Sequence, residues 1–212
     1  MNVYYDYKFD GIWQIGDDIA HSSMPNARPG DVRVSNINRN TGLPDSLVNP
    51  NDRQVIRRDP DFILSFTTGV KFKGIEFSAD VYIVKGGIRS NPFLSEYNYG
   101  GSLQGYKNGI SRQYWVPENP SNTVFRPHET VMSEYRGALD YQNSSYVRIT
   151  NLTLAYTFPD KWMQAIKIAR LKIYVRGDNL FTFTKYLSFG PETNPDDYPQ
   201  TADVTVGVNV NF

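Results

Sequence analysis

The sequence of 212 residues contains no cysteine and only two histidines. The absence of cysteine excludes disulfides, thiolate nucleophiles and cysteine-ligated metals. His21 and His128 lie far apart in polar surroundings and do not have the spacing of metal ligands. The acid pairs Asp17-Asp18 and Asp196-Asp197 are typical of solvated loops, and no motif positions a nucleophile, base or acid beside them. We therefore expect no enzyme activity, no metal site and no cofactor.

An excess of charge of one sign is also missing. Lys plus Arg and Asp plus Glu both number 22, which excludes the basic footprint expected of a nucleic-acid-binding protein. No stretch approaches the ~20 consecutive apolar residues of a membrane helix. Residues 1–10 lack the basic region followed by an apolar stretch that marks a signal peptide. Aromatic residues, by contrast, make up 14% of the chain and favour strands.

Apolar and polar side chains alternate through residues 62–72 and 75–83, on either side of Lys73-Gly74. A two-residue turn at this point would set Val70 opposite Phe77 and Lys71 opposite Glu76. In that register one face is apolar throughout, and opposite charges face each other on the second face. A shift of one residue would destroy both patterns. The sequence therefore predicts an antiparallel hairpin in this register.

Three further strands are predicted at residues 146–158, 171–183 and 204–212. The last strand alternates without interruption and ends in Phe212. The first is less regular, because simple alternation places Arg148 on the same face as Leu152 and Leu154. Asp160 is expected to cap a short helix within residues 161–168.

The connections between these strands differ in length according to the end of the sheet. Lys73-Gly74 and residues 159–170 are short, whereas the segments before the first strand, after the second and after the fourth are long and polar. Because antiparallel strands send alternate connections to opposite ends, the short turns share one end and the long loops the other. This arrangement, with strands of about 10 residues, is typical of outer-membrane barrels.

Two alternatives remain open at this point. A soluble β-sandwich that binds carbohydrate also has alternating strands, but its apolar faces point into a shared core. A complete small barrel, acting as a passive pore, would need at least three more strands from residues 1–60 and 86–144 to reach the minimum of about 8.

The favoured fold is all-β, an antiparallel transmembrane β-barrel to which this chain contributes the C-terminal strands. Five strands do not close a barrel, and an open edge in a bilayer leaves backbone groups unpaired. Residues 61–212 are expected to form barrel strands with a loop insertion at residues 86–144. Residues 1–60, which contain five prolines and no sustained alternation, are expected to form an extracellular loop region that precedes them.

Short motifs along the chain follow one another in an order that a known family shares. Tyr5–Gln14 resembles Y-x-Y-x-x-D-G-I-W-Q, Pro29–Val32 resembles P-G-D-I, and Asn51–Ile56 resembles N-D-R-x-x-I. Tyr146–Tyr156 is similar to Y-V-R-L-K-N-I-x-L-G-Y, and Val175–Thr182 is similar to V-x-G-Q-N-L-F-T. Pro191-Glu192, Tyr198-Pro199 and Val208–Phe212 complete the order. In these segments the sequence resembles the C-terminal fifth of a SusC/RagA-type TonB-dependent transporter.

The resemblance implies a barrel of about 22 strands in the cell outer membrane that imports glycans or peptides. It implies a SusD-like surface lipoprotein that covers the barrel, TonB acting through a plug region not present in this sequence, and outer-membrane lipid around the apolar faces. It also implies that the barrel-assembly machinery recognises the strand ending in Phe212. The family often has an acidic D-x-N-x-D-G segment after P-G-D-I, whereas this chain has Ser35–Gly42 with Arg39, so we expect no hard-cation site there.

Residues 86–144 hold aromatic side chains among Asn, Gly and Ser. The rings of Tyr97, Tyr99, Tyr114 and Trp115 can stack on sugar faces or peptide side chains while their polar atoms form hydrogen bonds. These four are the candidate substrate-binding residues. The alternative is that the rings pack the loop against itself or against the lipoprotein, because a long folded loop needs its own core.

Overall fold

The computed structural model describes residues 2–91, 113–127, 133–193 and 197–212. The chain divides into two compact units. The first unit comprises Met1–Asp59 and Gly87–Asn143, and the second comprises Pro60–Gly86 and Ser144–Phe212.

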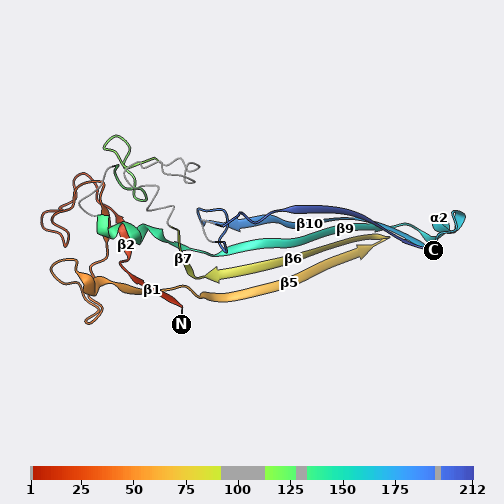
Figure 1. The fold of residues 1–212 in the computed structure, drawn as a ribbon, viewed down its shortest axis with the longest axis horizontal. Helices are drawn as coiled ribbons and strands as arrows, with labels where there is room; N and C mark the ends of the chain where they lie inside the picture. The colour runs from red at the N-terminus through yellow and green to blue at the C-terminus, as the bar shows by residue number, and fades with distance from the viewer. Residues whose placement is uncertain (1, 92–112, 128–132, 194–196) are drawn as a thin grey trace. The chain divides into compact units, whose positions relative to one another are not determined.

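The second unit is built on a five-stranded antiparallel sheet with the strand order β11-β10-β9-β6-β5. The long strands run side by side (Figure 1). Their bounds are β5 Pro60–Phe72, β6 Ile75–Gly86, β9 Tyr146–Thr157, β10 Arg170–Thr184 and β11 Asp203–Asn211. Strands of 9 to 15 residues are long enough for a tilted crossing of a bilayer.

The short helix α2, Asp160–Ala165, connects β9 to β10. Asp160 does not cap this helix, so that prediction is wrong. The helix begins one residue earlier than expected, because Pro159 holds the extended backbone of the N-cap position and makes no side-chain cap hydrogen bond. A proline is compatible with a helix start, where a backbone N–H has no partner within the helix.

The hairpin register predicted from the sequence is confirmed. Val70 pairs with Phe77 and Lys71 pairs with Glu76 along β5 and β6. The turn consists of Lys73 and Gly74, whose φ angles are 45° and 87°. Two central residues with positive φ are the requirement of a type I′ turn, whose twist matches that of the flanking strands.

The expected face of Arg148 is wrong, because β9 contains a bulge. Its register with β6 shifts at Thr150, which is an extra residue on β9. One extra residue inverts the alternation beyond it. Arg148 therefore lies on the polar face, where it pairs with Tyr82 of β6 and Thr182 of β10, while Leu152 keeps its place on the apolar face.

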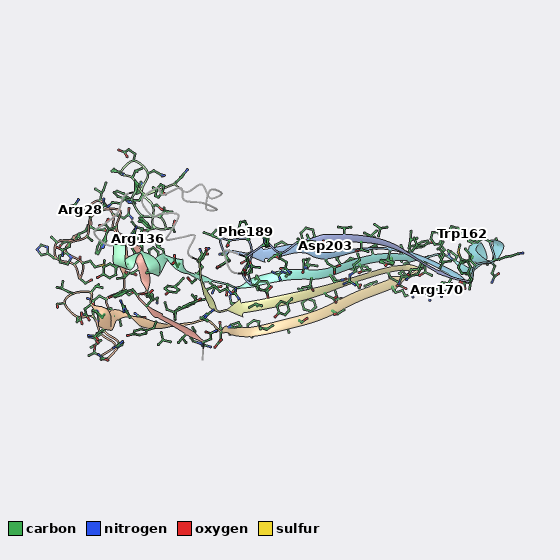
Figure 2. All side chains as sticks on the ribbon, in the orientation of Figure 1. Arg28, Arg136, Trp162, Arg170, Phe189 and Asp203 are labelled. Atoms are coloured by element: carbon green, nitrogen blue, oxygen red, sulfur yellow. The ribbon has the colours of Figure 1, made fainter. Side chains whose placement is uncertain are left out.

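The opposite face of this sheet carries apolar side chains that remain exposed. Phe66 is 44% exposed, Phe77 is 42% exposed and Val208 is 59% exposed. Side chains project from both faces of the strands (Figure 2). The other exposed apolar side chains of this face include Phe62, Leu64, Val70, Phe72, Ile75, Leu154, Ile173, Val175, Phe181, Phe183, Val204 and Val206. A sandwich would bury these side chains in a shared core, so the sandwich alternative is wrong for the described strands.

The first unit contains three two-stranded sheets and two short 3-10 helices among its described residues. The sheets pair β1 Val3–Asp6 with β4 Gln54–Arg57, β2 Phe9–Ile12 with β3 Val32–Val34, and β7 Ile88–Ser90 with β8 Tyr141–Asn143. The 3-10 helices are η1 Pro50–Asp52 and η3 Ser133–Asp140. None of these strands joins the five-stranded sheet, so the described residues do not provide the extra strands of a complete small barrel.

An apolar core fills the first unit. Its members are Tyr7, Ile12, Trp13, Met24, Ala27, Val32, Val34, Trp115, Phe125, Tyr135, Ala138 and Leu139. Ile12, Val32 and Phe125 are 0–1% exposed. These residues come from segments far apart in the sequence, so long-range packing holds the unit together.

Gly74 provides a test of the hairpin. A β-carbon at this position would lie 2.5 Å from the carbonyl oxygen of Thr157, and the backbone has a positive φ. We expect Gly74→Val to lower the free energy of unfolding by at least about 1 kcal/mol, because strain and a steric clash combine. Lys73→Asn is the matched control, since Asn tolerates positive φ, and it should change stability little. Urea titration in detergent micelles measures both, and equal stability of the two variants would contradict this account.

Candidate functional site

The polar face of the five-stranded sheet carries a chain of charged contacts. The ammonium group of Lys71 lies 2.6 Å from the Glu76 carboxylate, which also pairs with Lys172 of β10. Four residues further along β6, the Thr67 hydroxyl donates to the Asp80 carboxylate at 2.6 Å. The Lys71–Glu76 and Thr67–Asp80 contacts join adjacent strands, and the Lys172–Glu76 contact reaches across β9, so the register that separates the faces also brings these groups together.

A second polar group lies on β9 and β10. The Asn151 amide donates to the Asp178 carboxylate at 3.1 Å, and the guanidinium of Arg176 pairs with the same carboxylate at 2.9 Å. A β-carbon on Gly207 of β11 would lie 2.2 Å from the ring of Tyr174, which is too close for any side chain at that position. Gly207 therefore leaves room for the Tyr174 ring against the backbone of β11.

Arg148 is the most buried charged residue of the described sheet, at 4% exposed. Its Nε donates to the Thr182 hydroxyl at 3.0 Å, and its Nη1 pairs with the Glu192 carboxylate. Its guanidinium also lies 4.8 Å from the centre of the Tyr146 ring. Sequence reasoning missed this site, although a lone arginine in a run of apolar strand residues was a signal that the alternation changes there.

The structure describes two of the four candidate substrate-binding residues, Tyr114 and Trp115. Tyr97 and Tyr99 lie outside the described residues. Tyr114 is partly exposed, whereas Trp115 is 5% exposed and belongs to the apolar core. The indole N–H of Trp115 donates to the Gln14 side chain at 2.9 Å. This environment corresponds to the packing alternative for Trp115, and contact of these four residues with cargo stays a prediction.

The segment that replaces the family's acidic motif is held by amides. Asp45 accepts hydrogen bonds from the side chains of Asn38 and Asn49, at 3.0 and 3.1 Å, and its carbonyl oxygen accepts from Asn36 at 2.7 Å. One carboxylate surrounded by amide donors is a poor ligand set for a hard cation. Among the described residues, no group of three or more His, Cys, Asp or Glu residues could hold a metal ion.

Tyr141 and Asp6 form a polar contact in the first unit. The Tyr141 hydroxyl donates to the Asp6 carboxylate at 2.8 Å. Burial, and then this hydrogen bond to an anion, raise the pKa of Tyr141 above its ordinary value. The backbone N–H of Tyr7 donates to the other oxygen of the same carboxylate at 2.8 Å. Asp6 therefore joins β1 to β8.

No helix in the described part of the chain is long and apolar enough to cross a membrane. A scan against models of known protein families finds no match.

Comparison with curated proteins gives relatives along the whole chain. TonB-dependent receptor P3 of Formosa agariphila is 25% identical over 100% of this chain and 22% of its own length. TonB-dependent receptor SusC of Bacteroides thetaiotaomicron is 25% identical over 72% of this chain and 15% of its own length. The chain thus spans about a fifth of the length of these receptors.

Solved structures show the same fold. The RagAB peptide transporter matches 100% of this chain and 23% of its own chain, with a TM-score of 0.71 and 20% identity. The RagAB peptide importer in its open-open state matches with a TM-score of 0.66.

The antiparallel sheet, with one apolar and one charged face, therefore has the fold of part of an outer-membrane β-barrel. Within the class of such barrels, the chain is a homologue of the TonB-dependent receptors of the SusC/RagA type. The predicted family, the barrel fold and the outer-membrane localisation are confirmed, and the family is one of transporters and not of enzymes.

The Arg148 site yields a stability prediction. Arg148→Met should lower the free energy of unfolding by about 1–3 kcal/mol, because the hydrogen bond to Thr182 and the ion pair with Glu192 that the buried guanidinium makes are both lost. Lys172→Met is the matched control on the same polar face. It should cost less, because Glu76 keeps Lys71 as a second partner. Urea unfolding in micelles compares the two, and a larger loss for Lys172→Met would contradict this ranking.

The Tyr141 contact yields a pH prediction. A raised pKa means that native Tyr141 keeps its proton where the unfolded tyrosine, with a pKa of about 10, loses it. The resulting stabilisation is complete below about pH 10 and is lost as the pH rises above it. Tyr141→Phe should therefore weaken the decline in unfolding free energy above pH 10. Urea titrations across this range measure the decline, with Tyr198→Phe at a 95% exposed position as control. An unchanged decline in Tyr141→Phe would refute the assignment.

Proposed function

We propose that this chain forms the C-terminal barrel strands and associated surface loops of a TonB-dependent outer-membrane importer of glycans or peptides. The observation that best supports this proposal is the five-stranded sheet. One of its faces is apolar and exposed, and the other is charged and joined by ion pairs between strands. A face of this kind suits lipid, and the opposite face suits a water-filled lumen. The homology to TonB-dependent receptors adds the class of transport.

The remaining barrel strands would pair with the outer edges of β5 and β11. Within the described residues, each of these strands has a neighbour on one side only. In a bilayer such edges require partners, because lipid offers no hydrogen bonds to backbone groups. We propose that these partners come from sequence that precedes this segment in the complete receptor, together with the plug through which TonB acts.

The partners follow from the same proposal. The RagAB structures are of a peptide importer, and by analogy a SusD-like lipoprotein would cover this barrel and capture peptides or glycans. Residues 1–60 and 86–144 would form its extracellular loop region. The terminal strand, which ends in the 94% exposed Phe212, would be recognised by the barrel-assembly machinery. Tyr97, Tyr99, Tyr114 and Trp115 remain the proposed aromatic residues for cargo, with Trp115 acting from within the loop core.

The adjacent residues Phe77 and Ser78 test the assignment of the two faces, because they lie on opposite sides of β6. Phe77→Lys should place a charge in lipid, at a cost that reaches about 2–4 kcal/mol at the bilayer midplane and falls toward the interfaces. Ser78→Lys should be tolerated on the polar face beside Glu76 and Asp80. The amount of folded receptor in purified outer membranes measures both variants. Equal amounts would contradict the proposed faces.

Uptake of labelled oligopeptides and oligosaccharides by whole cells tests the transport itself. Cells that lack the receptor should lose energised uptake of one of the two classes, and a protonophore should abolish the same uptake in wild-type cells. Ser78→Lys should restore uptake and Phe77→Lys should not. Uptake that persists without the receptor would refute the importer proposal.

A further inference from the structure

Three arginines gather on one face of the β1–β4 ribbon. Arg57 follows Val55 on this face of β4, Arg53 lies one residue before the strand in extended backbone, and the register sets Tyr5 directly opposite Val55. The guanidinium of Arg39 lies 5.2 Å from the centre of the Tyr5 ring, between the two other arginines along the ribbon. We call Arg39, Arg53 and Arg57, with Tyr5 and Val55, the arginine face.

These arginines are not neutralised by carboxylates. In the part of the chain that the structure describes, Arg39, Arg53 and Arg57 form no ion pair. The acids of the surrounding segments bind other groups: Asp6 accepts from a tyrosine hydroxyl, and Asp45 accepts from asparagine amides. The positive charge of the face is therefore available to an anion from outside the unit.

Local structure holds the guanidinium groups in place. The backbone N–H of Arg39 donates to the carbonyl of Asn51 at 2.9 Å, which fixes the loop beside η1. A capping box formed by Asn49 and the buried Asp52 closes η1 immediately before Arg53. Arg53 in turn lies 5.1 Å from the centre of the Tyr7 ring. An arginine stacked on a ring keeps its N–H edge free and is pre-organised for a carboxylate.

The spacing of the arginine face matches an extended peptide. Arg53 and Arg57 are four residues apart in extended backbone, about 13 Å, and Arg39 stacks on Tyr5 opposite the residue midway between them, so successive arginine positions along the ribbon are about 7 Å apart. Alternate side chains of an extended peptide have the same spacing of about 7 Å. The exposed Tyr5 and Val55 offer apolar contact between the charges. We propose that the arginine face binds an extended peptide whose carboxylate side chains occupy alternate positions.

This inference rests on the proposed function only in treating such a peptide as cargo from solution. Binding and uptake are therefore measured separately. The probe is a fluorescent peptide of about ten residues that alternates Asp and Ser, and its comparison peptide alternates Asn and Ser. Binding is measured by fluorescence anisotropy at low salt on the complete receptor in detergent micelles.

The double variant Arg53→Gln/Arg57→Gln should raise the Kd for the acidic peptide about tenfold or more, because two charge-assisted contacts are lost. The control Arg28→Gln/Lys185→Gln removes the same net charge at exposed positions outside the arginine face and should change the Kd less than about twofold. Thermal unfolding of each variant verifies that the receptor remains folded. The Asn-Ser peptide should bind weakly to all forms.

Equal weakening in the two double variants would overturn the site, since only the net charge would matter. Dextran sulfate that displaces the peptide with the same arginine dependence and higher affinity would overturn the commitment to a peptide. Whole-cell uptake separates the two proposals. Arginine-dependent binding without receptor-dependent uptake of any labelled oligopeptide or oligosaccharide would leave the arginine face standing and refute the importer. Energised uptake together with a Kd that is unchanged in Arg53→Gln/Arg57→Gln would refute the arginine face and leave the importer standing.

Discussion

The two-residue period of the strands is the constraint on which the sheet depends. It directs apolar side chains to one face and charged ones to the other, and hydrogen bonding between strands fixes both sets at once. The Lys71–Glu76 contact and the Val70–Phe77 pair are two consequences of one register. A shift of the β5–β6 register by one residue would place Glu76 and Asp80 beside Phe66 and Phe72 on the apolar face. Register errors are therefore penalised on both faces, and this specifies the sheet more strongly than apolar patterning alone.

The bulge at Thr150 shows how the same constraint handles an exception. Without an extra residue, the alternation that places Leu152 and Leu154 on the apolar face would place Arg148 there as well. The bulge inverts the parity of the remaining strand, and Arg148 reaches Thr182 and Glu192 on the polar face. The cost of one interrupted ladder step is offset because a buried guanidinium gains charged and aromatic partners instead of facing lipid.

A feature could be predicted from the sequence when the residues that determine it lie close together along the chain. The β5–β6 hairpin was predictable because its turn, alternation and charge pairing lie within about twenty consecutive residues. The parity of β9 was predictable only in part, because Arg148 indicates that the alternation changes, whereas Thr150, the extra residue, is an ordinary strand residue. The burial of Trp115 was not predictable either, since its partner Gln14 lies about a hundred residues away in the sequence. Aromatic residues in polar loops suit cargo and loop cores equally, and only tertiary contacts distinguish the two.

The two units accommodate their apolar side chains in different ways, and this difference explains their sequence patterns. The first unit buries Ile12, Val32 and Phe125 within itself, so its sequence needs no period and tolerates prolines between short strands. The sheet of the second unit exposes its apolar side chains and keeps the two-residue period outside the bulge at Thr150, because an apolar face that suits lipid needs a continuous surface and not a shaped core. A self-contained unit can hold charged groups such as the arginine face in fixed positions in water. Recognition of a polar ligand is therefore better suited to the first unit, while the second provides a regular wall whose polar face is already occupied by its own ion pairs.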